Sequence, residues 1–151
     1  SESDFHDRVL LELVDFYSQR PNLVAAIPAL LPAPGRITSP FGFRKLPAGG
    51  WQIHEGIDIA ANFGTEVVAP ADGIVEESHY SPGYGRYVIL NHGYGLKTRF
   101  AHASKVLVKA GEWIKRGTQI ALVGGSGRTR GVHLHYEISL NGVPVDPRDY
   151  M

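Results

Sequence analysis

Cysteine is absent from the 151-residue sequence, and its absence excludes several kinds of scaffold and site. The chain has no disulfide framework, no zinc site built from thiolates and no cysteine nucleophile. The lack of cysteine does not identify a compartment, although it suits a protein that works in an oxidising one. Any metal site must therefore be built from histidines and oxygen ligands.

An excess of charge of one sign and a long apolar run are also absent. Lys and Arg together number 15, as do Asp and Glu, so the net charge is zero and there is no basic footprint for nucleic acid. No apolar stretch approaches the roughly 20 residues of a membrane-spanning helix, and no signal peptide is visible. With 43% hydrophobic and 20% charged residues, the composition suits one domain with a real core.

One amphipathic helix is expected, over Asp4 to Gln19, where apolar residues recur every three to four positions. Pro21 ends it, and a further helical turn is expected within Asn22 to Leu31. The apolar stripe predicts a packing partner, either the domain that follows or an upstream or regulatory region. A proline-rich connector comes next. We therefore expect a boundary that separates residues 1–34, helix and connector, from residues 35–151, the main domain.

The main domain is expected to be mainly β. Beyond Gly35, short β-rich runs alternate with glycine turns, and no run has a helical pattern. Many short strands at such spacing predict an antiparallel sheet or sandwich. The expected strands are Arg36–Ser39, Ile57–Ala60, Glu66–Val68, Gly73–Glu77, Tyr87–Asn91, Lys97–His102, Glu112–Ile114, Gln119–Val123, Val132–Ser139 and Val143–Val145.

His133, His135 and Glu137 alternate with apolar residues near the end of the chain. A period of two is typical of a strand, so the three polar residues share one face while the apolar set faces the core: Val132, Leu134, Tyr136 and Ile138. Same-face neighbours lie roughly 7 Å apart. The two imidazoles can converge on one metal ion, or one can bind it while the other serves a neighbouring water. The alternative is a pair of surface histidines.

His54 and Asp58 form a second candidate cluster. In a straight strand they would be about 13 Å apart, too far to share an ion. A bend at Gly56, which tolerates conformations closed to other residues, would bring them together, with His54 on a loop and Asp58 on the strand that follows. A third candidate, His102, is expected at the end of a strand.

Taken together, these clusters favour a metal site more strongly than each does alone. Two imidazoles and one carboxylate supply three ligands and leave the fourth tetrahedral position of Zn²⁺ to water, which is the pattern of a catalytic zinc site. Two further histidines then remain to serve the water and the reacting group. A metal site accounts for His54, Asp58, His102, His133 and His135 together, whereas unrelated roles would need five coincidences.

From about Gly35 to Tyr150 the sequence resembles the LytM/lysostaphin-type zinc metallopeptidases, the M23 family, which cut peptide bonds in bacterial peptidoglycan. The spaced histidine motifs, in this order, are the most specific part of the resemblance. The segments that carry it are Ser39–Arg44, His54–Asp58, Gly64–Thr65, Val68–Pro70, Gly83–Gly85, His92–Gly93, Thr98–His102, Gly111–Ile114 and Gly131–Glu137.

The resemblance implies the roles of the site residues. His54, Asp58 and His135 would be the ligands of one zinc ion, and His102 and His133 the two catalytic histidines. The spacing alone does not tell which member of the 133/135 pair binds the metal. The resemblance also implies an antiparallel β core, hydrolysis of peptidoglycan cross-links through a metal-activated water, and a location in the periplasm or at the cell surface. The alternative is a non-catalytic LytM-like regulator or wall-binding module that activates another wall hydrolase.

Three arginines are candidates for contact with the substrate. Arg128 and Arg130 are candidates for binding its carboxylates, and Arg44 for stabilising charge near the oxyanion. Guanidinium groups suit planar anions, and stem peptides carry free carboxylates. The alternatives are solvated charges in the turn that holds Arg128 and Arg130, and a structural ion pair for Arg44. Which bond is cut, a D-alanine–diamino acid cross-link or a glycine bridge, stays open, although the Phe41–Arg44 run favours the direct cross-link.

Overall fold

The computed structural model describes residues 2–19, 21–129 and 131–151. Two helices, α1 (Glu2–Ser18) and α2 (Pro21–Ala26), precede the strands, and a 3₁₀ turn spans Pro147–Asp149. The strands, in chain order, are β1 (Arg36–Ser39), β2 (Gly42–Lys45), β3 (Trp51–His54), β4 (Ile57–Ala60), β5 (Glu66–Val68), β6 (Gly73–Ser81), β7 (Gly85–Gly93), β8 (Leu96–Val106), β9 (Trp113–Ile114), β10 (Gln119–Val123), β11 (Leu134–Leu140) and β12 (Val143–Val145).

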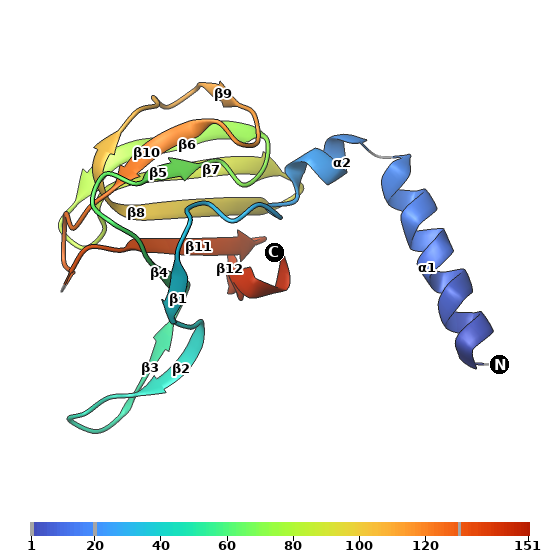
Figure 1. Cartoon of the computed structure of the whole chain (residues 1–151), viewed down its shortest axis with the longest axis horizontal. Coiled ribbons are helices and arrows are strands. Elements are labelled where there is room, and N and C mark those ends of the chain that lie inside the picture. Colours follow the sequence, from blue (N-terminus) through green and yellow to red (C-terminus); the bar gives the residue numbers. More distant parts are fainter. Residues whose placement is uncertain (1, 20, 130) are drawn as a thin grey trace.

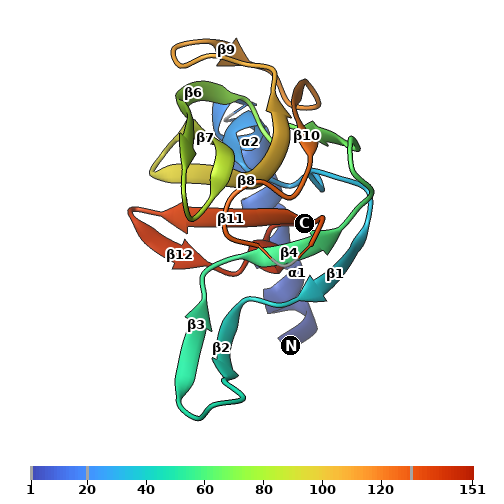
Figure 2. The same ribbon diagram turned by 90° about the vertical axis from the view of Figure 1, so that its left-hand side faces the viewer.

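Ten of these strands form one antiparallel sheet, whose main path runs β1-β4-β11-β8-β7-β6-β9. Strand β10 pairs with β5 and β8, and β12 pairs with β11. The other two strands, β2 and β3, form a separate hairpin that projects from the body of the domain (Figure 1, Figure 2). The predicted fold class, a mainly β antiparallel domain behind an N-terminal helix, is therefore confirmed.

The core lies against the apolar face of the central strands. From β11, Leu134, Tyr136 and Ile138 are all buried, and the ring of Tyr136 stacks on that of Phe100 from β8 with the centroids 5.3 Å apart. Val132 was predicted to belong to this apolar set, and that prediction is wrong, since its side chain is 45% exposed. The reason is that β11 begins only at Leu134, so the strand alternation does not reach Val132.

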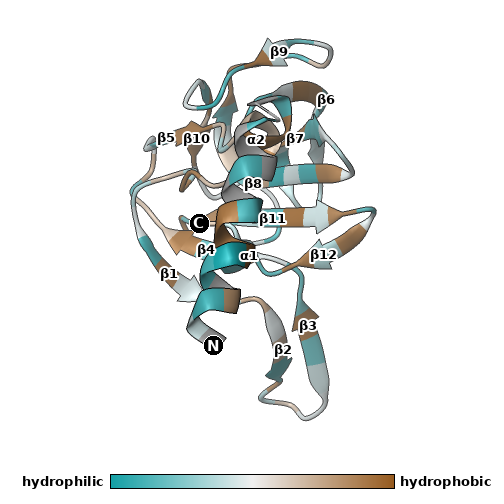
Figure 3. Ribbon diagram, turned by 90° about the vertical axis from the view of Figure 1, so that its right-hand side faces the viewer, coloured by the Kyte–Doolittle hydropathy of each residue, from teal (hydrophilic) through white to brown (hydrophobic). Residues whose placement is uncertain are grey.

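Helix α1 stands apart from the sheet, beyond α2 (Figure 1). Figure 3, which faces this helix, shows hydrophobic segments among the hydrophilic ones on its surface. Its apolar side chains Phe5, Leu10 and Leu11 are 60%, 62% and 69% exposed. The side chains of the other predicted stripe residues Leu13, Val14, Phe16 and Tyr17 lie outside the described part of the chain, so the packing partner of the stripe stays a prediction. No helix in the described part combines the length and apolar character that a membrane span needs.

Helix α2 and the connector after it are attached to the sheet domain. The guanidinium of Arg116 donates hydrogen bonds to the carbonyls of Val24 and Ile27, at 2.8 and 2.9 Å. Arg116 thus binds the C-terminal end of α2, where the last carbonyls of a helix face outward and a cation is favourable. The backbone N–H of Val68 donates to the carbonyl of Pro32 in the connector, which leads directly into β1.

Candidate metal centre

The pairing of β4 with β11 brings the first two site residues together. The strands are antiparallel, and Asp58 lies directly opposite His135 in their register. Opposed residues of neighbouring strands point to the same face. Accordingly, Nδ1 of His135 lies 2.9 Å from Oδ1 of Asp58. This contact between residues 77 positions apart depends on the register of the sheet.

A bend at Gly56 brings the third residue, His54, to the same carboxylate. Strand β3 ends at His54 and β4 begins at Ile57, and Nε2 of His54 lies 3.5 Å from Oδ1 of Asp58. The prediction that His54 lies on a loop is therefore wrong, since it ends a strand. Glycine is required at 56 because a Cβ there would stand 2.3 Å from the carbonyl oxygen of Tyr136 in β11, which is too close.

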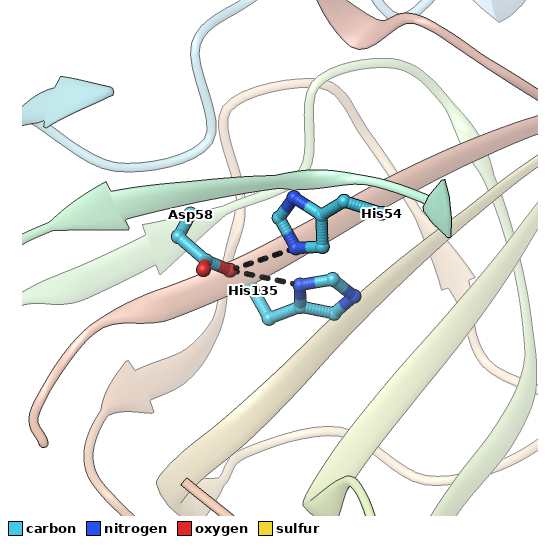
Figure 4. Close-up of side chains that lie close together, drawn as sticks. All are labelled: His54, Asp58 and His135. Atoms are coloured by element: carbon cyan, nitrogen blue, oxygen red, sulfur yellow. Dashed lines mark hydrogen bonds and ion pairs between the residues drawn. The ribbon is translucent and has the colours of Figure 1, made fainter. Parts of the chain in front are cut away.

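His54, Asp58 and His135 each contribute an atom to a group in which all three atoms lie within 4.8 Å of one another (Figure 4). Nδ1 of His54 lies 2.9 Å from the carbonyl oxygen of Pro40, to which it must donate, so Nε2 carries the lone pair that faces Asp58. Ligands about 2.0–2.1 Å from one Zn²⁺ ion in a tetrahedral site stand about 3.3 Å apart, close to the separations seen here. The three residues fit a zinc ion.

His102 reaches the site through an irregularity of β8. This strand has one extra residue opposite β7 between Phe100 and Ala103, and His102 takes a positive φ of 62° there. Such a bulge redirects a side chain. The backbone N–H of His102 donates to the carbonyl of Tyr84, and Nδ1 donates to the carbonyl of Ser126 at 2.8 Å. His102 was predicted at a strand end. In fact β8 continues to Val106.

His133 lies beside the three grouped residues, just before β11. Its Nε2 is 3.6 Å from Oδ1 of Asp58, against 2.9 Å for Nδ1 of His135. Nδ1 of His133 lies 3.2 Å from the hydroxyl of Thr129, and the ring centroids of His133 and His102 are 5.2 Å apart. Four imidazoles and one carboxylate thus gather at one place in the sheet.

The carboxylate and the imidazoles influence one another's pKa values. Burial opposes ionisation of Asp58, but the close approach of the His135 and His54 imidazoles outweighs it and holds the pKa of Asp58 well below its usual range. Burial alone would lower the pKa of His135, but hydrogen bonds to Asp58 and Glu137 raise it to about 9. Burial lowers the pKa of His102, which keeps this ring neutral near pH 7. Metal ligation requires a neutral imidazole, so a cation at the site would displace a proton from His135.

These residues line a cleft of about 770 Å³. Its walls include Arg44, Lys45 and Gln52 from the β2–β3 hairpin, together with Arg128 and Thr129. Two of the predicted substrate-binding arginines, Arg44 and Arg128, therefore line the cleft, while Arg130 lies outside the described residues. The guanidinium of Arg44 also donates to Ser39 Oγ at 3.1 Å and to Gln52 Oε1 at 3.4 Å, so part of its function is to hold the hairpin.

Several residues around the site were not assigned a function from the sequence. The carbonyl of Pro40 orients His54, and Ser39 Oγ lies 3.4 Å from the same ring nitrogen. Glu137 Oε1 lies 3.6 Å from Nε2 of His135. Of these, Glu137 could have been identified from the sequence, because it follows His135 by two positions on the same strand face. A backbone carbonyl such as that of Pro40 leaves no signal in the side-chain pattern.

Comparisons with known proteins agree with this geometry. Residues 52–147 match peptidase family M23. The chain is 48% identical over 115 residues to an uncharacterized metalloprotease of Haemophilus influenzae, covering 74% of this chain and 24% of that protein. It is 44% identical over 113 residues to the DD-carboxypeptidase/endopeptidase Mpg of Neisseria meningitidis, covering 74% of this chain and 26% of Mpg.

Among solved structures, a zinc-containing peptidase from Vibrio cholerae superimposes with a TM-score of 0.72 and 40% identity, over 76% of this chain and 37% of that one. The chain spans about a quarter of the length of the curated relatives it matches. The family match covers well over half of the sequence and includes all five clustered residues. Four of them, His54, Asp58, His102 and His135, lie on strands, and the fifth, His133, lies just before β11. The chain therefore belongs to peptidase family M23.

Proposed function

We propose that this chain is the catalytic part of a zinc-dependent endopeptidase that hydrolyses peptide cross-links of bacterial peptidoglycan. The observation that carries the proposal is the convergence of His54, Asp58 and His135 within 4.8 Å, in a cleft that His102 and His133 also line. Two histidines and one carboxylate with an open fourth position are typical of catalytic zinc. The names of the relatives, a zinc-containing peptidase and a DD-carboxypeptidase/endopeptidase, support the same activity.

In the proposed reaction His54, Asp58 and His135 hold the zinc ion. Bound zinc would supply Lewis-acid polarisation of the scissile carbonyl and activation of the attacking water. His102 is suited to accept the proton of that water, because its Nδ1–H is committed to the carbonyl of Ser126 and its Nε2 is the acceptor nitrogen. His133, near the same carboxylate oxygen, is suited to donate to the developing oxyanion or the leaving amine.

We further propose that the bond cut is the direct cross-link between D-alanine and a diamino acid. When the diamino acid carries a second carboxyl group next to its side-chain amine, that linkage leaves a free carboxylate beside the scissile amide, whereas a glycine bridge has none. Arg44 and Arg128 line the cleft and can pair with such a carboxylate. The relative named a DD-carboxypeptidase/endopeptidase supports the same bond. Arg130, two positions from Arg128, is proposed as a further substrate contact.

The remaining assignments follow from this activity. Residues 35–151 would form the catalytic domain, in keeping with a family match at 52–147 and a first strand at Arg36. Residues 1–34 would form a helix and connector outside it. Since peptidoglycan lies outside the cytoplasmic membrane, the enzyme would work in the periplasm or at the cell surface.

Digestion of isolated sacculi tests the proposal. Zinc-loaded protein is incubated with sacculi of the direct cross-link type and of the glycine-bridge type, and the released peptides are identified by mass spectrometry. We expect cleavage of D-alanine–diamino acid bonds in the first substrate, and no cleavage of either by the His102→Ala variant. Binding to both kinds of sacculus without release of peptides would overturn the enzymatic proposal and would favour a wall-binding module.

A further inference from the structure

A second carboxylate lies on the far side of the His135 ring from Asp58. Glu137 follows His135 by one same-face step of β11 and is only 8% exposed. Its Oε1 lies 3.6 Å from Nε2 of His135, while Nδ1 of that ring faces Asp58 at 2.9 Å. Each nitrogen of the imidazole therefore faces a carboxylate oxygen, that of Asp58 within hydrogen-bond distance and that of Glu137 within ion-pair distance. The Glu137 oxygen lies on the side away from the grouped ligand atoms.

Glu137 is itself fixed by two residues from other parts of the chain. Arg99 lies opposite it on β8 and donates from NH1 to Oε2 at 3.2 Å. Tyr84, in the turn between β6 and β7, donates its hydroxyl to Oε1 at 3.0 Å. Arg99 NH1 also donates to the Tyr84 hydroxyl at 2.9 Å, and the guanidinium carbon lies 4.4 Å from the Tyr84 ring centroid. The three side chains form a closed network.

This network differs from the support of the other histidine ligand. Nδ1 of His54 donates to a backbone carbonyl, that of Pro40, whose position is set by the fold. The corresponding acceptor for His135 is a side chain, which rotates unless something holds it. Buried carboxylates are costly without partners, and Arg99 and Tyr84 supply both charge and hydrogen bonds. A single substitution can therefore alter the orientation of the His135 ring and leave that of the His54 ring unchanged.

We propose that Glu137, held by Arg99 and Tyr84, is a positioning residue that fixes the ring of His135 with Nδ1 toward Asp58 and so strengthens zinc binding at the site. The inference rests on the metal site of the proposed function. A carboxylate that accepts the second N–H of a metal-binding histidine fixes the tautomer and orientation of the ring. Loss of such a partner typically weakens metal affinity by about 10–100-fold.

Glu137 can be changed without altering the walls of the catalytic cleft. Together with Arg99 it lines a separate cavity of about 210 Å³, whereas His135 lines the cleft of about 770 Å³. An effect of Glu137 on zinc binding would therefore act through His135. A network that only stabilises the sheet would instead lower the melting temperature of the zinc-free protein and leave its zinc affinity unchanged.

The test measures zinc affinity of the zinc-free protein by competition with a chelating dye. We expect Glu137→Ala to bind zinc at least 10-fold more weakly than the unaltered chain, with Glu137→Gln, which keeps an acceptor oxygen, in between. Arg99→Met should weaken zinc binding in the unaltered background and have little further effect when combined with Glu137→Gln, because it acts through Glu137. Glu76→Gln is the matched control, since Glu76 pairs with Lys97 of the same strand β8 at 2.9 Å, outside the site.

Zinc affinities of Glu137→Gln and Glu137→Ala within twofold of the unaltered chain, in folded protein, would overturn the inference. Tyr84→Phe removes one hydrogen bond to Glu137 and gives a second measure if Glu137→Ala does not fold. We expect it to weaken zinc binding by less than Glu137→Ala does, and an unchanged affinity would count against the network. If the unaltered chain takes up no zinc, the metal site of the proposed function fails. If it binds zinc and the Glu137 variants bind it equally well, only the inference about Glu137 fails.

Discussion

The imidazole of His135 and the carboxylate of Asp58 meet at 2.9 Å although 77 positions separate them in the sequence. The pairing of β4 with β11 places them opposite each other, and the bend between β3 and β4 adds His54. The site therefore depends on how closely these strands approach. Gly56 lies at this bend, where the backbone passes close to Tyr136 of β11.

Gly56→Ala is expected to destabilise the fold and to damage the metal centre together. An added Cβ would stand 2.3 Å from the carbonyl oxygen of Tyr136, so β3, β4 or β11 must shift. Overpacking of this kind costs about 1–3 kcal/mol in the free energy of unfolding. Denaturant unfolding and zinc titration should both report the change. Gly83→Ala is the matched control, because a Cβ there meets no atom within 4 Å. A Gly56→Ala variant as stable as the Gly83→Ala variant would contradict this explanation.

The main-domain strands illustrate how far the sequence alone could go. Two strands with clear apolar patterns were predicted at their observed bounds: Ile57–Ala60, which alternates, and Gln119–Val123, which is a short apolar run. The hairpin of β2 and β3 was missed. Trp51 and Ile53 alternate with polar residues in β3, but the run is only four residues long, and β2 has Phe43 as its one large apolar residue. That omission matters for function, since the hairpin supplies Arg44 and Gln52 to the cleft.

The metal centre was predictable in its residue types but not in its contacts. Two histidines two apart on a strand, with His54 and Asp58 upstream, indicate metal chemistry. The approach of β11 to β4 is set by sheet register, which local patterns do not contain. The orientation of His102 depends on a bulge and a positive φ, and no local pattern marks this position. Tyr84 and Arg99 come from other parts of the chain and bind the carboxylate of Glu137, so the spacing of the histidines does not point to them.

Acidification is expected to destabilise the protein through His92, a histidine outside the cleft. Its Nδ1 donates to the carbonyl of Asp72 at 2.7 Å and its Nε2 lies 2.7 Å from the Thr98 hydroxyl. Burial lowers the pKa of His92. Because the folded-state pKa lies below the unfolded value of about 6.5, the unfolded chain takes up the proton first, and the free energy of unfolding falls as the pH drops below about 6.5.

Thermal unfolding between pH 7.5 and 5 tests whether the stability of the protein falls with decreasing pH because of His92. The melting temperature of the unaltered chain should fall more steeply with decreasing pH than that of His92→Asn, which cannot take up the proton. His79→Asn, which changes an exposed histidine, should keep the slope of the unaltered chain. Equal slopes for His92→Asn and the unaltered chain would show that His92 does not carry the effect.

Arg128→Ala is expected to weaken substrate binding without affecting the chemical step. If the guanidinium pairs with a substrate carboxylate, its loss removes a charge-assisted hydrogen bond of about 1.5 kcal/mol, roughly a tenfold rise in KM. The rate constant kcat on a purified cross-linked peptide should stay near its original value. Lys105→Ala, which removes an exposed cation away from the cleft, should change neither constant. An unchanged KM for Arg128→Ala would show that the guanidinium of Arg128 is a solvated charge that does not bind the substrate.

The zinc content of single alanine variants, measured by mass spectrometry of the metal after saturation and desalting, tests the central claim most directly. The unaltered chain should hold one zinc ion, and His54→Ala, Asp58→Ala and His135→Ala should hold little or none. His133→Ala should keep most of its zinc while its turnover falls by about 10²–10⁴-fold, as expected for a positioned acid–base group. A zinc-free His133→Ala beside a fully loaded His135→Ala would contradict the account.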